Sequence, residues 1–126
     1  MKQESQKWFQ KAEKTIEAAG KMLEIDSLEF SINRAYYAMF YVARGLLADK
    51  DLRFRKHGAT HGAYGQHFAK TKELDPKFHS WILEAFDQRI LSDYEVEPEV
   101  GREEAQILIE RAKEFLQAAR VYLSKS

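Results

Sequence analysis

Apolar residues near the start of the chain recur every three or four positions, the spacing that places side chains on one face of an α-helix. This pattern predicts a first helix that runs from near the start to about Glu24, with Gly20 weakening its last turn. Its inward face consists of Trp8, Phe9, Ala12, Ile16, Ala19 and Leu23.

A second helix is predicted from about Leu28 to Ala48, and its middle is apolar nearly all round. A helix of this kind must be covered on most sides, so we expect it to be the central helix of a bundle. Asp26 and Ser27 precede it and are expected to accept hydrogen bonds from its free amides. Gly45 permits a close crossing with a neighbouring helix.

The helical pattern is interrupted over the next twenty residues. The charged stretch 49–58 predicts a loop, and Gly58, Gly62 and Gly65 predict a short or imperfect helix that ends near Lys70. This middle part is therefore expected to contain more loop than the rest.

Two further helices are predicted in the second half. Asp75 followed by Pro76 is a cap and a first-turn proline, which predicts a helix that ends near Asp93. Residues 95–101 lack a helical period and contain Pro98, so they are expected to form an extended connection. The last helix has one apolar stripe of Ala105, Leu108, Ile109, Ala112, Phe115, Leu116, Ala119 and Leu123.

These elements predict an all-α protein, an antiparallel up-and-down four-helix bundle with an additional short helix. No repeat and no strand pattern is visible, so residues 1–126 are expected to form a single helical domain. A chain of this length buries one ordinary hydrophobic core.

Composition narrows the class of protein. Hydrophobic residues make up 44% of the chain, which is enough apolar surface for a folded domain and excludes general disorder. There is no cysteine, which excludes disulfides and thiolate metal sites. The N-terminus does not resemble a signal peptide and no apolar run reaches the roughly 20 residues of a spanning helix, so we expect a cytoplasmic protein with no membrane contact.

Charge is balanced overall and uneven locally. The 20 basic and 20 acidic residues cancel, so no global field draws the chain to nucleic acid. The stretch 50–72 is basic and the stretch 93–110 is acidic. Two copies of the chain could attract each other through these stretches, which slightly favours a dimer.

Three separated segments resemble the HEPN domain family, helical domains named for nucleotide binding in higher eukaryotes and prokaryotes. The first is the run from Asn33 to Phe40, with the sequence NRAYYAMF. The second is Thr60-His61-Gly62 leading into 66–71, and the third is Arg89-Ile90-Leu91-Ser92-Asp93-Tyr94. The last segment is similar to the branch of the family with an Arg-x-x-x-Asp-Tyr motif.

The resemblance implies a homodimer, with a minimal nucleotidyltransferase as its partner in a toxin-antitoxin-like pair. It also implies nucleotide or RNA binding, and some members are ribonucleases that need no metal. Those nucleases use an arginine followed, after four to six intervening residues, by a histidine. Arg89 is present here, but the corresponding positions hold Tyr94, Glu95 and Val96. The resemblance therefore leaves open whether this chain is an enzyme, and its catalytic residues are unknown.

Candidate binding residues follow from the third segment. Arg89 and Asp93 are four residues apart and can pair on a helix, which by itself requires no function. The functional interpretation is that Arg89 contacts phosphate and Tyr94 stacks on a base. Asn33 and Tyr37 are one turn apart on the central helix and are candidates to line the same cleft, although a structural hydrogen bond explains Asn33 equally well.

The histidines of the basic stretch are weaker candidates. His57 and His61 have a metal-ligand spacing, but Gly58 is expected to interrupt a shared helix and no third ligand is evident, so neither a metal nor a cofactor is predicted. His61 is also a candidate proton-transfer residue in place of the missing histidine. Lys56 lies in a basic segment with two interpretations. The first is a solvated loop, and the second is an edge that contacts phosphate.

Three functions remain open. The first is a HEPN protein that binds nucleotide or RNA and pairs with a nucleotidyltransferase. The second is a metal-independent ribonuclease toxin. The third is a non-catalytic structural or protein-interaction module, in which Arg89 and Asp93 only brace the end of a helix.

Overall fold

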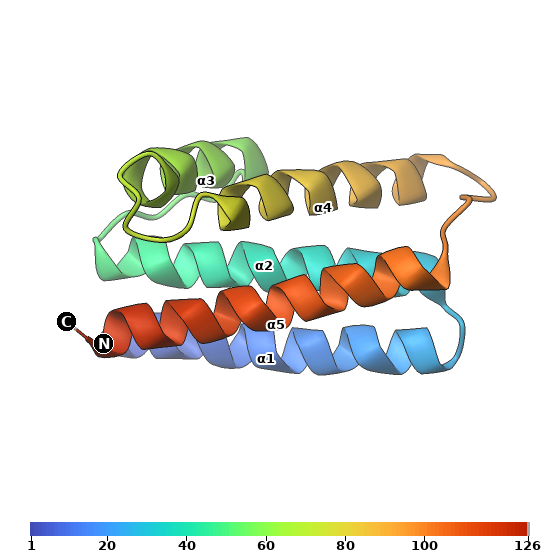
Figure 1. Cartoon of the computed structure of the whole chain (residues 1–126), viewed down its shortest axis with the longest axis horizontal. Helices are drawn as coiled ribbons and strands as arrows, with labels where there is room; N and C mark the ends of the chain where they lie inside the picture. The colour runs from blue at the N-terminus through green and yellow to red at the C-terminus, as the bar shows by residue number, and fades with distance from the viewer. Residues whose placement is uncertain (126) are drawn as a thin grey trace.

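The computed structural model of the chain, described over residues 1–125, contains five α-helices and one π-helical turn. The long helices are α1 (Gln3–Glu24), α2 (Leu28–Asp49), α4 (Lys77–Tyr94) and α5 (Arg102–Ser124). The short helix α3 (His57–Tyr64) continues into the π-helical turn η1 (Gly65–Ala69). The long helices alternate in direction along the bundle, which confirms the predicted all-α, up-and-down architecture with an additional short helix (Figure 1).

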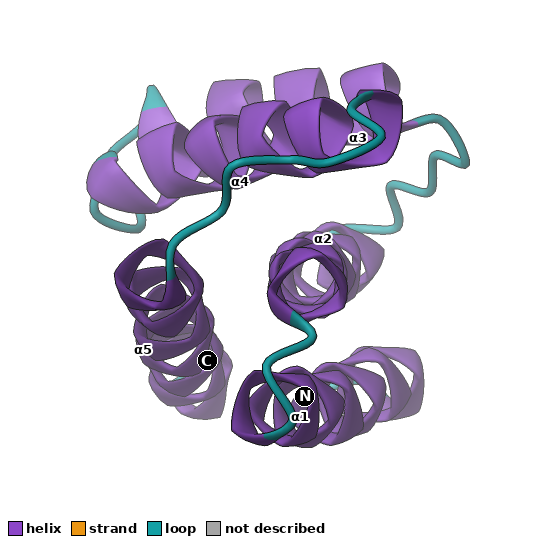
Figure 2. Cartoon of the chain, turned by 90° about the vertical axis from the view of Figure 1, so that its right-hand side faces the viewer, coloured by secondary structure: helices purple, strands orange, loops and turns teal. Residues whose placement is uncertain are grey.

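Helix α2 is the buried axis of the bundle, as its sequence predicted. It packs against α1, α3, α4 and α5. Figure 2 shows α1 on one side of α2, the layer of α3 and α4 on the opposite side, and α5 on a third side. The fourth side of α2 is not covered by any helix of the described chain. This uncovered side becomes important for the functional site.

Gly45 allows α1 and α2 to approach closely, which confirms its predicted role. A Cβ atom at this position would lie 2.6 Å from Cε1 of Phe9, closer than carbon atoms can pack. The hydroxyl of Ser5, on α1, donates a hydrogen bond of 2.7 Å to the carbonyl oxygen of Gly45. The crossing therefore has one polar contact at its centre.

Of the two predicted helix caps, one is confirmed and the other is wrong. The Asp75 side chain accepts a hydrogen bond of 2.9 Å from the amide of Lys77, as its position before Pro76 predicted. The prediction that Asp26 and Ser27 cap α2 with their side chains is wrong, because no side-chain cap bond forms there. Asp26 instead takes a left-handed conformation (φ 59°) in the tight turn after α1, and its carboxylate pairs with Arg102 at 2.6 Å.

Hydrophobic side chains from all the helices form one connected core. Its largest fully buried members include Tyr36, Tyr64, Phe9, Phe68 and Phe115. Within residues 1–125, no helix combines the length and the apolar character needed to cross a bilayer.

Candidate functional site

A buried tyrosine from α2 lies between two histidines from α3. The Tyr36 hydroxyl oxygen is 2.5 Å from Nδ1 of His57 and 2.8 Å from Nε2 of His61. A hydroxyl has one proton, so it donates to one imidazole nitrogen and accepts an N–H from the other. Tyr36 is fully buried, His61 is 5% exposed and His57 is partly exposed. We refer to these three residues as the Tyr36 cluster.

Helix α3 presents both histidines because they are four residues apart, which places them on one helix face. The expectation that Gly58 interrupts this face is wrong, because α3 begins at His57 and includes the glycine. The packing of α3 on α2 is sufficient to hold one glycine in helical conformation. Aromatic rings surround the cluster: Phe40 stacks on His57 with 4.4 Å between centroids, and Phe86 contacts His61 at 5.0 Å.

Burial changes the proton affinities of all three side chains. Removal from water lowers the pKa of His61 to about 4, with a further contribution from the nearby imidazoles of His57 and His79. Burial, followed by the positive charges of Arg89 and Arg44, also lowers the pKa of His57. Burial raises the pKa of the Tyr36 phenol well above its ordinary value. At neutral pH the cluster therefore consists of a neutral phenol and two neutral imidazoles.

Arg89 of α4 lies beside this cluster. Its guanidinium carbon is 5.8 Å from the centroid of the Tyr36 ring and 5.2 Å from that of Tyr37. Its side chain is 22% exposed. Nε lies 3.2 Å from a carboxylate oxygen of Asp93, as the four-residue spacing predicted, but the two are not aligned for a hydrogen bond. Nε is therefore buried without a hydrogen-bond partner among the described residues.

A second arginine approaches Tyr37. The guanidinium of Arg34 lies 4.9 Å from the Tyr37 ring centroid. It also donates hydrogen bonds of 3.1 and 2.8 Å to the side-chain oxygen of Asn33. Tyr37 is thus contacted by two guanidinium groups, one from its own helix and one from α4.

The structure therefore gathers five of the seven residues selected from the sequence. Arg89, Asp93 and Tyr37 are in contact, Asn33 joins them through Arg34, and His61 joins them through Tyr36. Two lie apart from this group. Tyr94 is 84% exposed, beyond Arg89 at the end of α4, and Lys56 is exposed in the loop before α3.

Sequence reasoning missed three members of the group: Tyr36, His57 and Arg34. Tyr36 lies in the apolar middle of the helix predicted to be central, and this placement is correct for its ring but leaves out its hydroxyl. His57 was considered only as a metal ligand, whereas its Nδ1 is directed at the Tyr36 hydroxyl. The described residues contain no group of three or more His, Cys, Asp or Glu side chains arranged to hold a metal ion. The four-residue spacing of the two histidines was the available signal.

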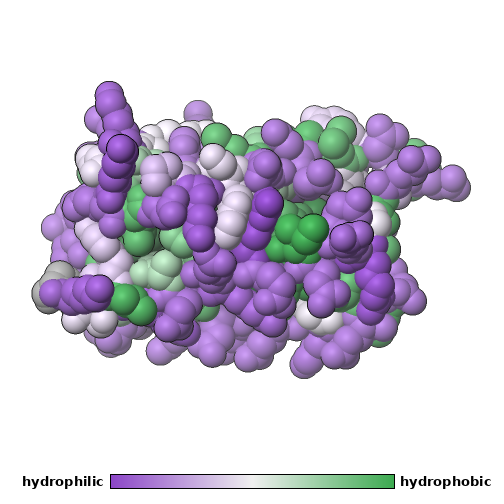
Figure 3. All heavy atoms as spheres, viewed as in Figure 1, coloured by the Kyte–Doolittle hydropathy of each residue, from purple (hydrophilic) through white to green (hydrophobic). Residues whose placement is uncertain are grey.

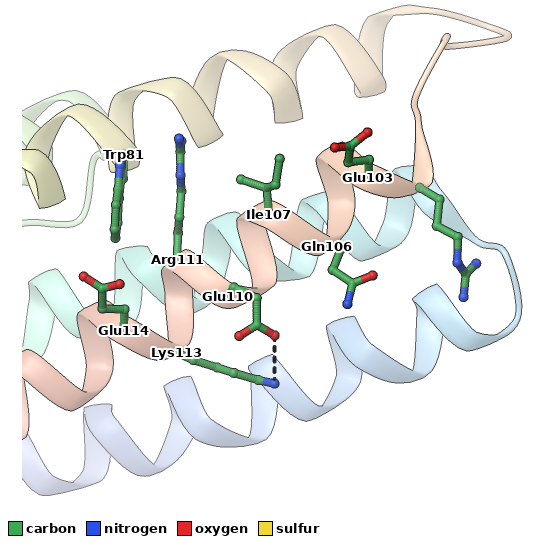
Figure 4. A pocket seen from close by; sticks show the side chains of 9 residues that line it. Trp81, Glu103, Gln106, Ile107, Glu110, Arg111, Lys113 and Glu114 are labelled. Carbon is green, nitrogen blue, oxygen red and sulfur yellow. Dashed lines mark hydrogen bonds and ion pairs between the residues drawn. The ribbon is translucent and has the colours of Figure 1, made fainter.

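A cavity of about 920 Å³ lies elsewhere, in an open groove between α4 and α5. Hydrophobic side chains are visible between these two helices, bordered by hydrophilic ones (Figure 3). Figure 4 shows Trp81 extending from α4, and Arg111 and Ile107 extending from α5 toward it. We refer to this feature as the α4–α5 groove, and its lining also includes Arg102, Glu103, Gln106, Glu110, Lys113 and Glu114.

Charges in the α4–α5 groove are balanced and largely paired. Three cationic and three anionic side chains line it. Arg111 pairs with Glu84 at 2.8 Å and Lys113 with Glu110 at 3.3 Å. An anionic ligand would meet as many carboxylates as cations there, so volume alone does not make this groove a phosphate site.

The Arg89 side has the groups that a phosphate site needs. A half-buried guanidinium with one unpartnered N–H binds phosphate oxygens, and a partly exposed tyrosine ring stacks on a base. The neutral imidazole of His57, next to both, is able to accept a proton. The geometry is thus suited to binding a phosphate ester and has a base beside it.

Comparisons with known proteins identify the family of this chain. The family model of the HEPN domain matches residues 5–122. The chain is 34% identical to the Methanocaldococcus jannaschii protein named "Putative toxin MJ0142", over 97% of this chain and 83% of that protein. It is 32% identical to a UPF0332 protein of Gloeobacter violaceus, over 99% of this chain and the whole of that protein, and 31% identical to one of Thermotoga maritima, over 88% and 84%. Because the family match spans nearly the whole chain, this protein belongs to the HEPN domain family.

Proposed function

We propose that this HEPN protein is the toxin-like member of a toxin-antitoxin-like pair and binds nucleotide or RNA through Arg89. The observation that carries the proposal is the position of the Arg89 guanidinium, half-buried over Tyr36 and Tyr37 with its Nε unpartnered. Phosphate oxygens would accept hydrogen bonds from the accessible part of this guanidinium, whose side chain is 22% exposed. The relatives named as toxins, from Methanocaldococcus jannaschii, support the toxin-like role.

Among the described residues, Asp93 is the carboxylate that pairs with Arg89, and we propose that a ligand displaces it. Its side chain is 47% exposed, so the pair is screened by solvent and contributes little to stability. A phosphate that carries more negative charge and accepts two aligned hydrogen bonds can replace the carboxylate. Tyr37, with Arg34 on it, then provides the surface for a base.

A titration of the full chain with a fluorescein-labelled single-stranded RNA and with ATP tests this proposal. Arg89→Ala is expected to weaken binding by at least about tenfold, since a charge-assisted hydrogen bond contributes about 1.5–3 kcal/mol. Arg111→Ala is the matched control, because Arg111 also lies over an aromatic ring and pairs with a carboxylate. No binding by the unmodified chain, or equal losses in both variants, would overturn the proposal and favour a structural or protein-interaction module.

The proposed partner protein is a minimal nucleotidyltransferase, and the chain itself is proposed to be a homodimer. Both come from the resemblance to HEPN proteins of such pairs, and the basic and acidic stretches of the sequence are compatible with self-association. A nucleotidyltransferase gene next to this one, with co-elution of the two proteins after co-expression, would support the pairing. Light scattering of the chain alone tests the dimer.

A metal-independent ribonuclease is the second candidate, and one observation favours it. The histidine that is absent after Arg89 in sequence has a counterpart in space, because His57 of α3 and Arg89 of α4 both lie against the rings of Tyr36 and Tyr37. His57 is partly exposed and would act as the base beside the bound phosphate. RNA cleavage in the presence of chelator, abolished by His57→Ala and retained in His67→Ala, would support this reading. No cleavage by the unmodified chain would exclude it.

A further inference from the structure

The uncovered side of α2 carries two aromatic rings with a cation on either side of them. Arg34, Tyr37, Tyr41 and Arg44 are spaced three, four and three residues apart, which places them on one helix face, and all four are partly exposed. We call this row the α2 face. No acidic residue occurs in α2 between Glu29 and Asp49.

Neighbouring helices extend the same pattern. From α1, Trp8 stacks on Tyr41 with 5.7 Å between centroids, and Lys11 lies 4.6 Å from the Tyr41 ring. From α4, Arg89 lies against Tyr37. The rings of Trp8, Tyr37 and Tyr41 therefore each have a cation against them, and a cation beside an aromatic surface is the combination by which proteins hold single-stranded nucleic acid.

A cavity of about 330 Å³ lies at the end of the α2 face that is remote from Arg34. Three arginines and one carboxylate line it, together with Trp8 and Phe54; the charged residues are Arg44, Arg53, Arg55 and Glu4. We call it the Arg44 pocket. Its volume is in the range of small-ligand sites.

The charges of the Arg44 pocket are only partly compensated. Arg53 is paired with Glu4 at 2.8 Å. Arg44 donates a short hydrogen bond to the carbonyl oxygen of Phe54, and its Nε is buried without a hydrogen-bond partner in the described chain. Its guanidinium lies 5.1 Å from the Trp8 ring. The pocket thus repeats the features of the Arg89 site: a half-buried arginine with one free N–H, next to an aromatic ring.

We infer that the α2 face is a track for single-stranded RNA, with phosphate held at Arg89 at one end and in the Arg44 pocket at the other. This inference rests on the proposed function and specifies its ligand as a run of nucleotides. Tyr37 and Arg44 are about 10 Å apart along the helix axis. Successive nucleotides of a stacked strand rise about 3.4 Å along the axis, so one nucleotide does not reach both ends.

The cations favour RNA over an uncharged or apolar partner. The α2 face and the side chains that contact it include four cations, Lys11, Arg34, Arg44 and Arg89, and its rings contact one another with a cation against each. A single-stranded phosphodiester chain matches this surface, because its phosphates pair with cations and its bases stack on rings.

A length series of RNA tests the inference. Labelled oligouridylates of two, four and eight nucleotides are titrated into the full chain, and UMP is used as a competitor. Affinity is expected to rise at least tenfold from the dinucleotide to the octanucleotide, and UMP is expected to compete only weakly. Equal affinity per molecule for UMP and the octanucleotide would overturn the track while leaving nucleotide binding at Arg89 intact.

Substitutions in and beside the Arg44 pocket provide the second test of the inference. Arg55→Ala removes an exposed cation that lines the Arg44 pocket, and should lower the slope of log affinity against log salt by about 0.7 for the octanucleotide. Trp8→Ala should weaken octanucleotide binding about fivefold or more through lost stacking. Neither variant should change competition by UMP, which would bind at Arg89. Lys113→Ala, in the α4–α5 groove, is the control.

The outcomes separate the two proposals. Octanucleotide binding that depends on Arg89 and is unaffected by Arg55→Ala and Trp8→Ala would overturn the track alone. Absence of binding to RNA of any length, with ATP also failing to bind, would overturn both. Melting of each variant by circular dichroism establishes that a loss of binding is measured on folded protein.

Discussion

Two arginines, Arg89 of α4 and Arg111 of α5, contact the same kinds of side chain in different surroundings. Arg89 lies against Tyr36 and Tyr37 and pairs with Asp93, while Arg111 lies 5.0 Å from the Trp81 ring and pairs with Glu84. The first is next to a buried hydrogen-bonded cluster, and the second lines the larger, open α4–α5 groove. The two arginines differ in how far they are removed from water and in how the charges around them are balanced. The volume of the neighbouring cavity does not account for this difference.

In the α4–α5 groove each cation has a carboxylate to neutralise it in water, so the interactions are weak and exchangeable. The Tyr36 cluster is buried. Losing a polar contact there costs more free energy, because a group left without a hydrogen-bond partner cannot bond to water instead. Substitutions should therefore have large effects at the cluster and small effects in the groove.

The largest difference is expected when the central rings are removed. Tyr36→Ala removes a fully buried ring and should lower the free energy of unfolding by about 3–5 kcal/mol. Trp81→Ala removes a larger but partly exposed ring and should cost clearly less. Urea unfolding followed by circular dichroism measures both. A Trp81→Ala loss equal to that of Tyr36→Ala would show that the groove is as important to stability as the cluster.

Removing only the Tyr36 hydroxyl should have the next largest effect. Tyr36→Phe keeps the ring and leaves polar nitrogens of His57 and His61 without their partner, which should cost about 1–3 kcal/mol. Tyr122→Phe is the matched control, because the Tyr122 hydroxyl donates to an exposed carboxylate, that of Glu73. Similar losses from both changes in chemical denaturation would contradict a special role for the buried hydroxyl.

The pH dependence of stability should identify the histidines. The pKa of His61 in the folded chain is about 4, below its ordinary value of 6.5, so protonation favours the unfolded chain. Stability should be complete above about pH 6.5 and fall between pH 6.5 and 4; the lowered pKa of His57 acts in the same direction. Melting temperatures at pH 7.5 and 5 measure the decrease, which His61→Gln should reduce and His67→Gln should leave unchanged. An equal decrease in all three proteins would assign it to other groups.

The smallest effect is expected in the α4–α5 groove. Arg111→Ala breaks a solvated ion pair and one contact with a ring, so the free energy of unfolding should change by less than about 1 kcal/mol. Salt should weaken this contribution further. A loss of several kcal/mol in the same urea assay would mean that the groove is organised like the buried cluster.

Individual residues show how far sequence reasoning reached. Arg89 and Asp93 were paired correctly, since their spacing alone places them together on a helix. His57 and His61 were correctly seen as four residues apart, but their shared partner lies 21 and 25 residues away on another helix. The cap at Asp75 was predicted and the one at Ser27 was wrong, because a turn can satisfy a helix end with backbone groups and leave the side chain free.

The sequence by itself determined the helices, their order and the central position of α2, because apolar periodicity and capping residues act within a few residues along the chain. It also determined the family, since the HEPN segments are short runs of adjacent residues. Only the tertiary structure decided that α3 turns both histidines onto Tyr36, that Arg89 lies on the neighbouring tyrosines, and that one side of α2 stays uncovered. These features depend on how whole helices pack, and packing is set by the complementary shapes of surfaces that lie far apart in sequence.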